Sequence, residues 1–477
     1  MNDFLISGES LNSYVREHIR RRRPSARLLI ALCASIWILI AASAPGVSRY
    51  AFVAMSFLCA LYLFWRSELQ YVSFVWWLYF LTPCIRRAVD YRVGFDETSL
   101  MLTAPLLAGA ISCFELLRLR RLDLRSLPFL LLTLSATYGL VVSLISGTSI
   151  VIVTRYFLEW LSPAAFGYLL YARWPCYSEF RDSLQNTFRW GLLVMGVYGV
   201  VQYLYAPMWD RFWMENVSEK ISSFGTPEPM GIRVFSTMTA PQSFALALVL
   251  GLLITFYGHS SLLQKAAWIA GYAGLLLSLA RSAWLEWAIA FLALAFLGRS
   301  RKILSSVAAS IFCLAALSLV TANLPVSRSV TERLQSLNDA DKDTSGQERV
   351  AGSESVLASS LSSPLGEGWG IEYENGNAIP MHDSAAVELI LCTGWIGFLL
   401  FYGALVFGIF EMLKYNGCSE DRFISIAVAL LLALFVETFF NSVVGGSNQL
   451  GLMTIMGLGL AATRNLDWRL SEFRAAA

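Results

Sequence analysis

Long apolar runs alternate with short polar breaks along most of the chain. A membrane-spanning helix needs roughly 20 mostly apolar residues, and the runs predict about fourteen such helices. The predicted spans are residues 28–44, 51–65, 71–85, 99–117, 127–145, 150–171, 188–205, 241–257, 266–280, 282–297, 303–322, 385–413, 423–440 and 450–462. This pattern predicts an all-α polytopic membrane protein.

Composition agrees with this fold class. The chain has 477 residues, of which 56% are hydrophobic and 15% are charged, whereas soluble domains carry about a quarter charged residues. A net charge of +2 gives no strong field to attract nucleic acid. The eight cysteines lie mostly inside apolar runs without metal-ligand spacing. The chain has no P-loop pattern, which argues against nucleotide-driven transport.

Lys and Arg residues indicate the orientation of the chain. They cluster in residues 16–27, 118–125, 173–189, 299–302 and 464–474, which the predicted spans place on one side. Positively charged loops are retained in the cytoplasm, so both termini are predicted to be cytoplasmic. A further group, Arg86, Arg87 and Arg92, is predicted to form a loop on the outer side, where it either weakens the third span or marks a functional basic site.

The spans divide the chain into five predicted regions. These are a cytoplasmic leader (1–27), a transmembrane bundle (28–322) with an extracytoplasmic loop near 206–240, a large extracytoplasmic loop (323–384), C-terminal transmembrane helices (385–463) and a cytoplasmic tail (464–477). Long loops on a membrane protein with otherwise short connections indicate function.

The first long loop and the turn after it each carry an arginine near an apolar helix. Trp209, Phe212 and Trp213 predict a short interfacial helix. Arg233 follows a stretch rich in Gly and Pro, where it either marks a helix end or binds a ligand. Arg281 stands between two apolar stretches with almost no loop, and an arginine at membrane depth costs several kcal/mol unless it snorkels or meets an anion. We therefore expect an anion at Arg281.

The second long loop contains acidic residues and ends at a histidine. Asp339, Asp341 and Asp343 resemble the start of a calcium loop, but Thr344 stands where the glycine is required and Val350 where a Glu is required. No metal site is predicted there. His382, next to Asp383, stands immediately before a long apolar run, where imidazole can accept a proton near neutral pH.

Three sequence patterns together resemble a known superfamily. They are "GIRVFSTMTAPQSFALAL" with Arg233, "LSLARSAWLEWAIAFL" with Arg281, and "HDSAAVELILCTGWIGFLLF" with His382. Their order and shared side resemble bacterial O-antigen ligases and O-antigen or exopolysaccharide polymerases, over residues 190–440. The family often has Asn where Asp383 stands, and an acidic residue just before the glycine at 394. These departures leave polymerase and ligase open.

The resemblance implies a C-type glycosyltransferase fold and an inverting, metal-independent transfer on the periplasmic face of the bacterial cytoplasmic (inner) membrane. The implied partners are a polyprenyl-diphosphate-linked glycan as donor, a glycan acceptor, membrane lipids and other envelope polysaccharide assembly proteins, without nucleic acid or cofactor. The implied site residues are His382 as catalytic base, Arg233, Arg281 and Arg349 on the diphosphate, Asp383 and Glu388 in support, and Trp369 and Tyr373 stacking on sugars.

Other functions remain open from the sequence. A transporter or flippase of lipid-linked glycan would place ionisable groups inside the membrane, and Arg155, Glu159 and Glu437 are its candidates. A non-catalytic scaffold of an envelope complex would not need the arginines and histidine.

Overall fold

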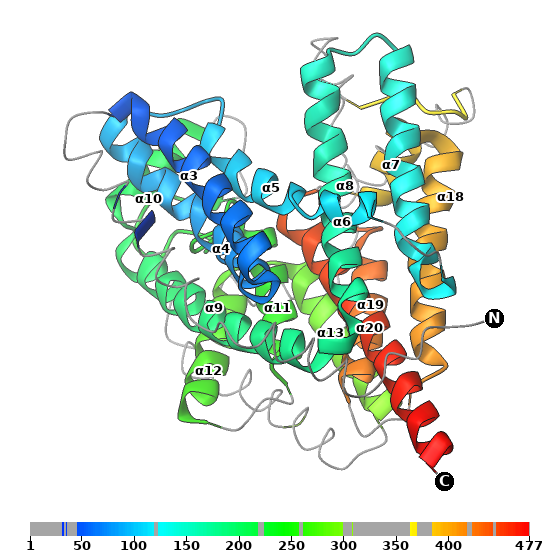
Figure 1. Ribbon diagram of the computed structural model, residues 1–477. Helices are drawn as coiled ribbons and strands as arrows, with labels where there is room; N and C mark the ends of the chain where they lie inside the picture. The colour runs from blue at the N-terminus through cyan, green and yellow to red at the C-terminus, as the bar shows by residue number, and fades with distance from the viewer. Residues whose placement is uncertain are drawn as a thin grey trace, which may run out of the picture.

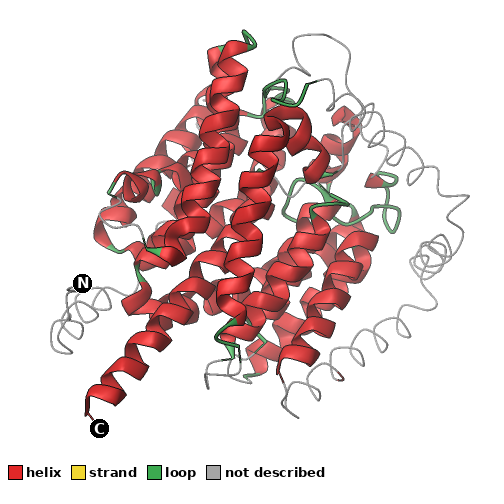
Figure 2. Ribbon diagram, turned by 90° about the vertical axis from the view of Figure 1, so that its right-hand side faces the viewer, coloured by secondary structure: helices red, strands yellow, loops and turns green. Residues whose placement is uncertain are grey.

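The computed structural model describes residues 31–32, 35, 45–118, 123–217, 224–256, 261–298, 308, 363–369, 384–416, 422–441 and 445–476. Within these residues all regular elements are helical, and β pairing is limited to an isolated bridge between Gly225 and Ile232. The predicted all-α class is therefore confirmed for the described residues. Figures 1 and 2 show the helices packed side by side in one bundle.

The helices up to residue 205 are α3 (Pro45–Arg66), α4 (Glu68–Val93), α5 (Thr103–Ala110), α6 (Cys113–Leu117), α7 (Leu127–Ile145), α8 (Ile150–Ala172) and α9 (Tyr177–Tyr205). Short 3₁₀ turns precede α5, α7 and α9 at Leu100–Leu102, Leu124–Ser126 and Trp174–Cys176. The later helices are α10 (Met208–Val217), α11 (Pro241–Ile254), α12 (Leu262–Leu277), α13 (Arg281–Gly298), α18 (Ala385–Leu413), α19 (Phe423–Glu437) and α20 (Gly446–Ala476).

The predicted spans from 51–65 to 282–297, and the three from 385 onward, each coincide with one of these helices or with a helix group. The predicted spans 28–44 and 303–322 lie almost wholly outside the described residues. Among the described residues, four helical segments are long and apolar enough to cross a membrane, namely Val47–Arg66, Leu100–Leu117, Leu124–Ile145 and Ala385–Leu413. A fifth is added if Trp174–Tyr205 and Met208–Val217, bent by 78°, form one span. The number of about fourteen membrane spans stays a prediction.

Ion pairs join the helix ends at one end of the bundle, which we call the arginine end. Arg173 binds Glu68 and Glu115, with Arg173 Nη1 2.8 Å from Glu115 Oε1. Arg464 binds Asp123 at 2.7 Å. Arg125 binds Asp467. The structure thus brings together arginines that the sequence grouped on one side.

The other end of the bundle, which we call the site end, holds the end of α4 and the start of α11, α13, α18 and α20. Helix pairs that lie far apart in sequence connect the two ends: α8 packs along α20, α7 along α18, α9 along α12, and α13 along α19 (Figure 1). The described loop segments that carry the predicted site residues Arg233 and Trp369 lie at this end.

The predicted outer loop at Arg86, Arg87 and Arg92 is helical, because α4 continues to Val93. Arg86 is 5% exposed and binds Asp90 at 3.1 Å. Arg87 is 1% exposed and binds a carboxylate of α10. Buried charges are tolerated when they are paired. Carboxylate partners therefore offset the charges of Arg86 and Arg87, two of the three arginines that run against the arginine asymmetry.

Helix α10 forms where a short interfacial helix was predicted, but its aromatic residues differ in exposure. Trp213 is only 6% exposed and packs edge-on against Phe224, with ring centroids 5.3 Å apart. Phe235 completes this small core. The inner face of α10 is therefore packed against the protein and encloses Trp213, while the depth of α10 in a membrane stays a prediction.

Candidate functional site

The turn between α12 and α13 brings Arg233 next to the start of α13. Leu279 in this turn has a left-handed backbone, with φ of 51°. Val234 N–H donates to Leu277 O at 3.1 Å, and Arg233 Nε donates to Ser278 O at 2.8 Å. Arg281 is the first residue of α13. The two predicted diphosphate-binding arginines therefore belong to segments that touch at one turn.

A hydrogen-bonded network links this turn to α11 and α19. Gln242 Nε2 donates to Ser282 Oγ at 2.6 Å and to Glu437 Oε1 at 3.0 Å. Asn441 Nδ2 also donates to Glu437 Oε1. Glu437 is only 2% exposed, and these amide donors orient its carboxyl group.

The same network continues to the start of α18. Ala385 N–H donates to Asn441 O, and Ala386 N–H donates to Thr438 O, both at 3.1 Å. Ser384 Oγ caps the helix by accepting from Val387 N–H at 3.5 Å. In the sequence Ser384 directly follows His382 and Asp383. The chain therefore enters α18 against the end of α19, beside the residues that bind Ser282.

Of the remaining predicted site residues, Glu388 lies half-buried in the first turn of α18. His382, Asp383, Arg349 and Tyr373 lie outside the described residues.

Trp369 is described, and its surroundings give it an anchoring role. It is 1% exposed and lies against Trp160, with ring centroids 5.6 Å apart. Its backbone N–H donates to Ser143 Oγ at 2.7 Å, and a Cβ on Gly139 would come within 2.5 Å of its ring. In this position neither face of the ring is open to a sugar. The predicted sugar stacking by Trp369 therefore does not fit the structure.

Residues 363–369 dock where α18 is kinked. Gly394 has φ 59° and ψ −169° inside this helix. Trp395 N–H donates to Pro364 O at 3.1 Å, while Glu367 and Gly368 N–H donate to Leu391 O and Cys392 O, both at 2.9 Å. The kink frees helix backbone groups that the docked segment then satisfies. A part of the predicted large loop is thus built into the bundle.

Sequence reasoning missed the residues that hold the Arg233 segment in place. Arg87 Nε binds Asp210 Oδ1 at 2.6 Å, Nη1 donates to Met238 O at 2.6 Å, and Nη2 donates to Ser236 O. Gln202 Oε1 accepts from Ser236 N–H at 2.7 Å, and Gln202 Nε2 donates to Asp210 at 2.9 Å. These buried side chains fix the backbone of residues 233–240. Two features of the sequence could have indicated this contact. Arg86 and Arg87 follow an apolar run without an evident partner, and Asp210 lies in the aromatic segment predicted to be a short helix.

Three carboxyl groups bear on the alternative functions that the sequence leaves open. Glu437, a candidate for a mid-membrane transport residue, is the last residue of α19 and not a mid-helix group. Glu286 lies one turn along α13 from Ser282, is 1% exposed, and its carboxyl oxygens have no hydrogen-bond partner in the described part of the chain. Arg155 and Glu159 are paired at 3.0 Å, with the arginine side chain 63% exposed.

Within the described ranges, no group of three or more His, Cys, Asp and Glu side chains is placed to hold a metal ion, and Asp339, Asp341 and Asp343 lie outside these ranges. No model of a known protein family matches the chain, and no curated protein is significantly similar to it. The family resemblance therefore depends on the three sequence patterns and on what their residues do.

Proposed function

We propose that the protein is a membrane glycosyltransferase that uses a polyprenyl-diphosphate-linked glycan as donor. The observation that carries this proposal is the meeting of three distant segments at the site end. Arg233 contacts the turn before Arg281, and Gln242, Glu437 and Asn441 connect Ser282 to the entry of α18. That entry directly follows His382 in the sequence.

The arginines supply the chemistry that a diphosphate leaving group needs. Guanidinium groups bind phosphate oxygens through two parallel charge-assisted hydrogen bonds and stay charged at any relevant pH. Helices α11, α13 and α18 also start at the site end, and the positive ends of their dipoles favour an anion there. Negative charge that develops on the departing diphosphate would be stabilised by these groups.

In the proposed reaction, an acceptor hydroxyl oxygen attacks the anomeric carbon of the donor sugar. The bond from this carbon to the diphosphate oxygen breaks as the new glycosidic bond forms, so the configuration inverts. His382 takes the proton from the hydroxyl, and the polyprenyl diphosphate leaves on Arg233 and Arg281. No step in this reaction requires a cofactor.

Among the transferases, we propose an exopolysaccharide or O-antigen polymerase on the periplasmic face of a bacterial inner membrane. Asp383 and the wording "HDSAAVEL" favour polymerase. An O-antigen ligase, which transfers the glycan to a lipid core, shares the donor chemistry and differs in the attacking hydroxyl.

The experiment that tests the proposal compares arginine variants in a deletion strain. Arg281→Ala should lower glycan transfer by at least about 100-fold, because loss of a transition-state charge partner costs about 3 kcal/mol or more. Arg281→Lys should recover only part of the activity, since an ammonium lacks the planar fork. The measurement is glycan chain length on gels, together with protein level in membranes.

A matched control is Arg181→Ala, since Arg181 pairs with its neighbour Asp182 in the first part of α9, near the arginine end. This variant should keep normal activity and protein level. Full transfer by Arg281→Ala at normal protein level would refute the diphosphate role and the proposed function with it.

A further inference from the structure

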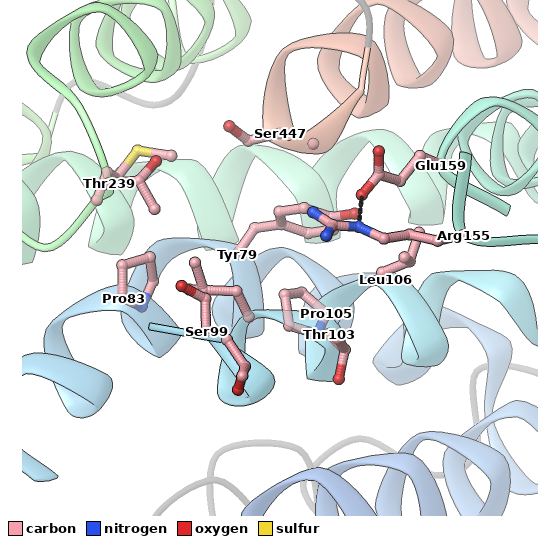
Figure 3. A pocket seen from close by; sticks show the side chains of 14 residues that line it. Tyr79, Pro83, Ser99, Thr103, Pro105, Leu106, Arg155, Glu159, Thr239 and Ser447 are labelled. Atoms are coloured by element: carbon pink, nitrogen blue, oxygen red, sulfur yellow. Dashed lines mark hydrogen bonds and ion pairs between the residues drawn. The ribbon is translucent and has the colours of Figure 1, made fainter. Parts of the chain in front are cut away.

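A cavity of about 300 Å³ lies at the site end, beside the end of the Arg233 segment (Figure 3). Its walls come from α4, the 3₁₀ turn and α5, α8 and the first turn of α20, with Met238 and Thr239 closing one side. Cavities that bind small molecules start at about this volume. It is separate from the turn at Arg281, but residues 233–240 border both.

The lining combines charged and hydroxyl groups with apolar patches. Arg155 and Glu159 form an ion pair that remains open to the cavity, with the Glu159 side chain 23% exposed. Ser99, Thr103, Thr239 and Ser447 add hydroxyl groups from three separate segments. Figure 3 shows these side chains around the ring of Tyr79. The cavity thus offers donors and acceptors from several directions.

The chemistry of this lining fits a sugar better than a lipid chain. A pyranose presents hydroxyl groups, which can both donate and accept, around apolar C–H faces. Pro83, Leu102 and Leu106 provide apolar surface for such a face. An isoprenoid chain would bury the ion pair and hydroxyls without replacing their hydrogen bonds to water, which is unfavourable.

We infer that this cavity binds a pyranose unit of the glycan acceptor, an assignment that rests on the proposed function. The position supports the role. Met238 and Thr239 line the cavity, whereas Arg233, at the start of the same segment, contacts the α12–α13 turn. Gln242, three residues after Thr239, belongs to the network at Ser282. An acceptor held here would therefore border the segment that carries the donor-binding arginine.

The test is direct binding of simple sugars to the full-length purified protein. The probes are methyl pyranosides of glucose, galactose, mannose and N-acetylglucosamine, measured by saturation-transfer difference NMR in a detergent without a sugar headgroup. Wild type should give saturation transfer to at least one probe. Ser447→Trp, which fills the cavity, should abolish that signal, and Glu159→Gln should weaken it by roughly tenfold, the value of one hydrogen bond to a charged group.

The matched control is Ser471→Trp, an exposed position on the same helix toward the arginine end. It should bind like wild type. If Ser447→Trp is not monodisperse by size-exclusion chromatography, Glu159→Gln and Thr239→Val decide the result. Absence of any pyranoside signal from wild type, or a signal that survives the cavity variants, would overturn the inference.

A further variant separates this inference from the proposed function. Arg281→Ala should bind the pyranosides normally and fail in glycan transfer. Normal transfer by Arg281→Ala with pyranoside binding intact would leave the sugar site standing and remove the diphosphate chemistry. Transfer that depends on Arg281, without any sugar binding in the cavity, would do the reverse.

Discussion

At the scale of single residues, the arginines of the site end divide into two kinds. Arg233 and Arg281 are partly exposed at a turn, whereas Arg87 is almost fully enclosed and donates to two backbone carbonyls of the Arg233 segment. A partly exposed guanidinium can bind a ligand. An enclosed one, neutralised by Asp210, fixes the backbone around it.

Removing Arg87 should destabilise the protein and displace the Arg233 segment. Arg87→Ala leaves Asp210 buried and unpaired, which costs about 3–5 kcal/mol, so the melting temperature in detergent should fall strongly. The double variant Arg87→Met with Asp210→Leu removes both charges and should recover much of the stability, while transfer stays low because the Ser236 and Met238 carbonyls lose their donors. Arg49→Ala, at a pair whose arginine is 18% exposed, is the control with a smaller loss. Wild-type transfer by the double variant would show that Arg87 does not position the segment.

His382 should act in the chemical step. Replacing it with Ala should lower this step by roughly 100 to 10,000-fold, the usual contribution of a general acid or base, while binding of the donor persists. For a polymerase, lipid-linked single repeat units should accumulate and long chains should disappear on gels. Long chains that remain on the lipid carrier would instead identify a ligase, and an unchanged glycan pattern would exclude His382 as the base.

At the scale of helices, the sequence predicted where the helices lie along the chain far better than which segments contact one another. Apolar runs of sufficient length predicted α3, α7, α8 and α18 because burial or lipid exposure along a whole helix requires such runs. The kink at Gly394 was hidden inside one of these runs. It depends on a segment that returns from the long loop to pair with the helix backbone. Such long-range pairing leaves no periodic signal in the sequence.

The absence of a sequence signal for long-range contacts also explains which parts of the site could be predicted. Arg233 and Arg281 were placed on the same side of the membrane, but their shared turn depends on Ser278 accepting from Arg233. Arg87 was wrongly assigned to a loop because its partner lies on α10, far along the chain. Trp369 was assigned to sugar stacking because aromatic residues in loops serve that role, whereas here the helices α7 and α8 enclose it.

The kink in α18 gives a test at this scale. Gly394→Ala adds a methyl group 2.4 Å from Pro364 O, in a backbone conformation that only glycine adopts readily and that costs other residues about 1–3 kcal/mol. The docked residues 363–369 should loosen, so the amides of Glu367 and Gly368 should exchange with deuterium faster. Gly403→Ala is the control. Gly403 lies in the same helix, and a Cβ at this position would have no neighbour within 4 Å. Equal exchange in both variants would show that the docking does not depend on the kink.

At the scale of the whole molecule, the two ends of the bundle carry different groups of arginines. Arg125, Arg173 and Arg464 lie in ion pairs at the arginine end, and the proposed site lies at the site end. If the helices cross a membrane, the asymmetry of Lys and Arg predicts that the arginine end faces the cytoplasm and the site end faces outward, as the proposed reaction requires.

Reporter fusions should reveal this arrangement. Alkaline phosphatase is active only outside the cytoplasm, so a fusion near Thr344 or Ser99 should be active, and one near Arg121 or Arg301 should be silent. The fused proteins are compared at equal amounts on immunoblots. Activity at Arg121 with silence at Thr344 would reverse the orientation and place the proposed site on the cytoplasmic side.

The docked segment at the α18 kink also changes how the loop that carries His382 is attached. Residues 363–369 are fixed on α18 and α7, and Ser384 is fixed by its own helix cap, so residues 370–383 connect two anchored points. The entropy of closing such a loop grows slowly, by about 0.6 kcal/mol for each doubling of its length. His382 is separated from Ser384 by a single residue, so its distance along the chain from the anchored start of α18 does not depend on the length of the rest of this segment. A change in length between residues 370 and 380 would therefore leave this short tether unchanged.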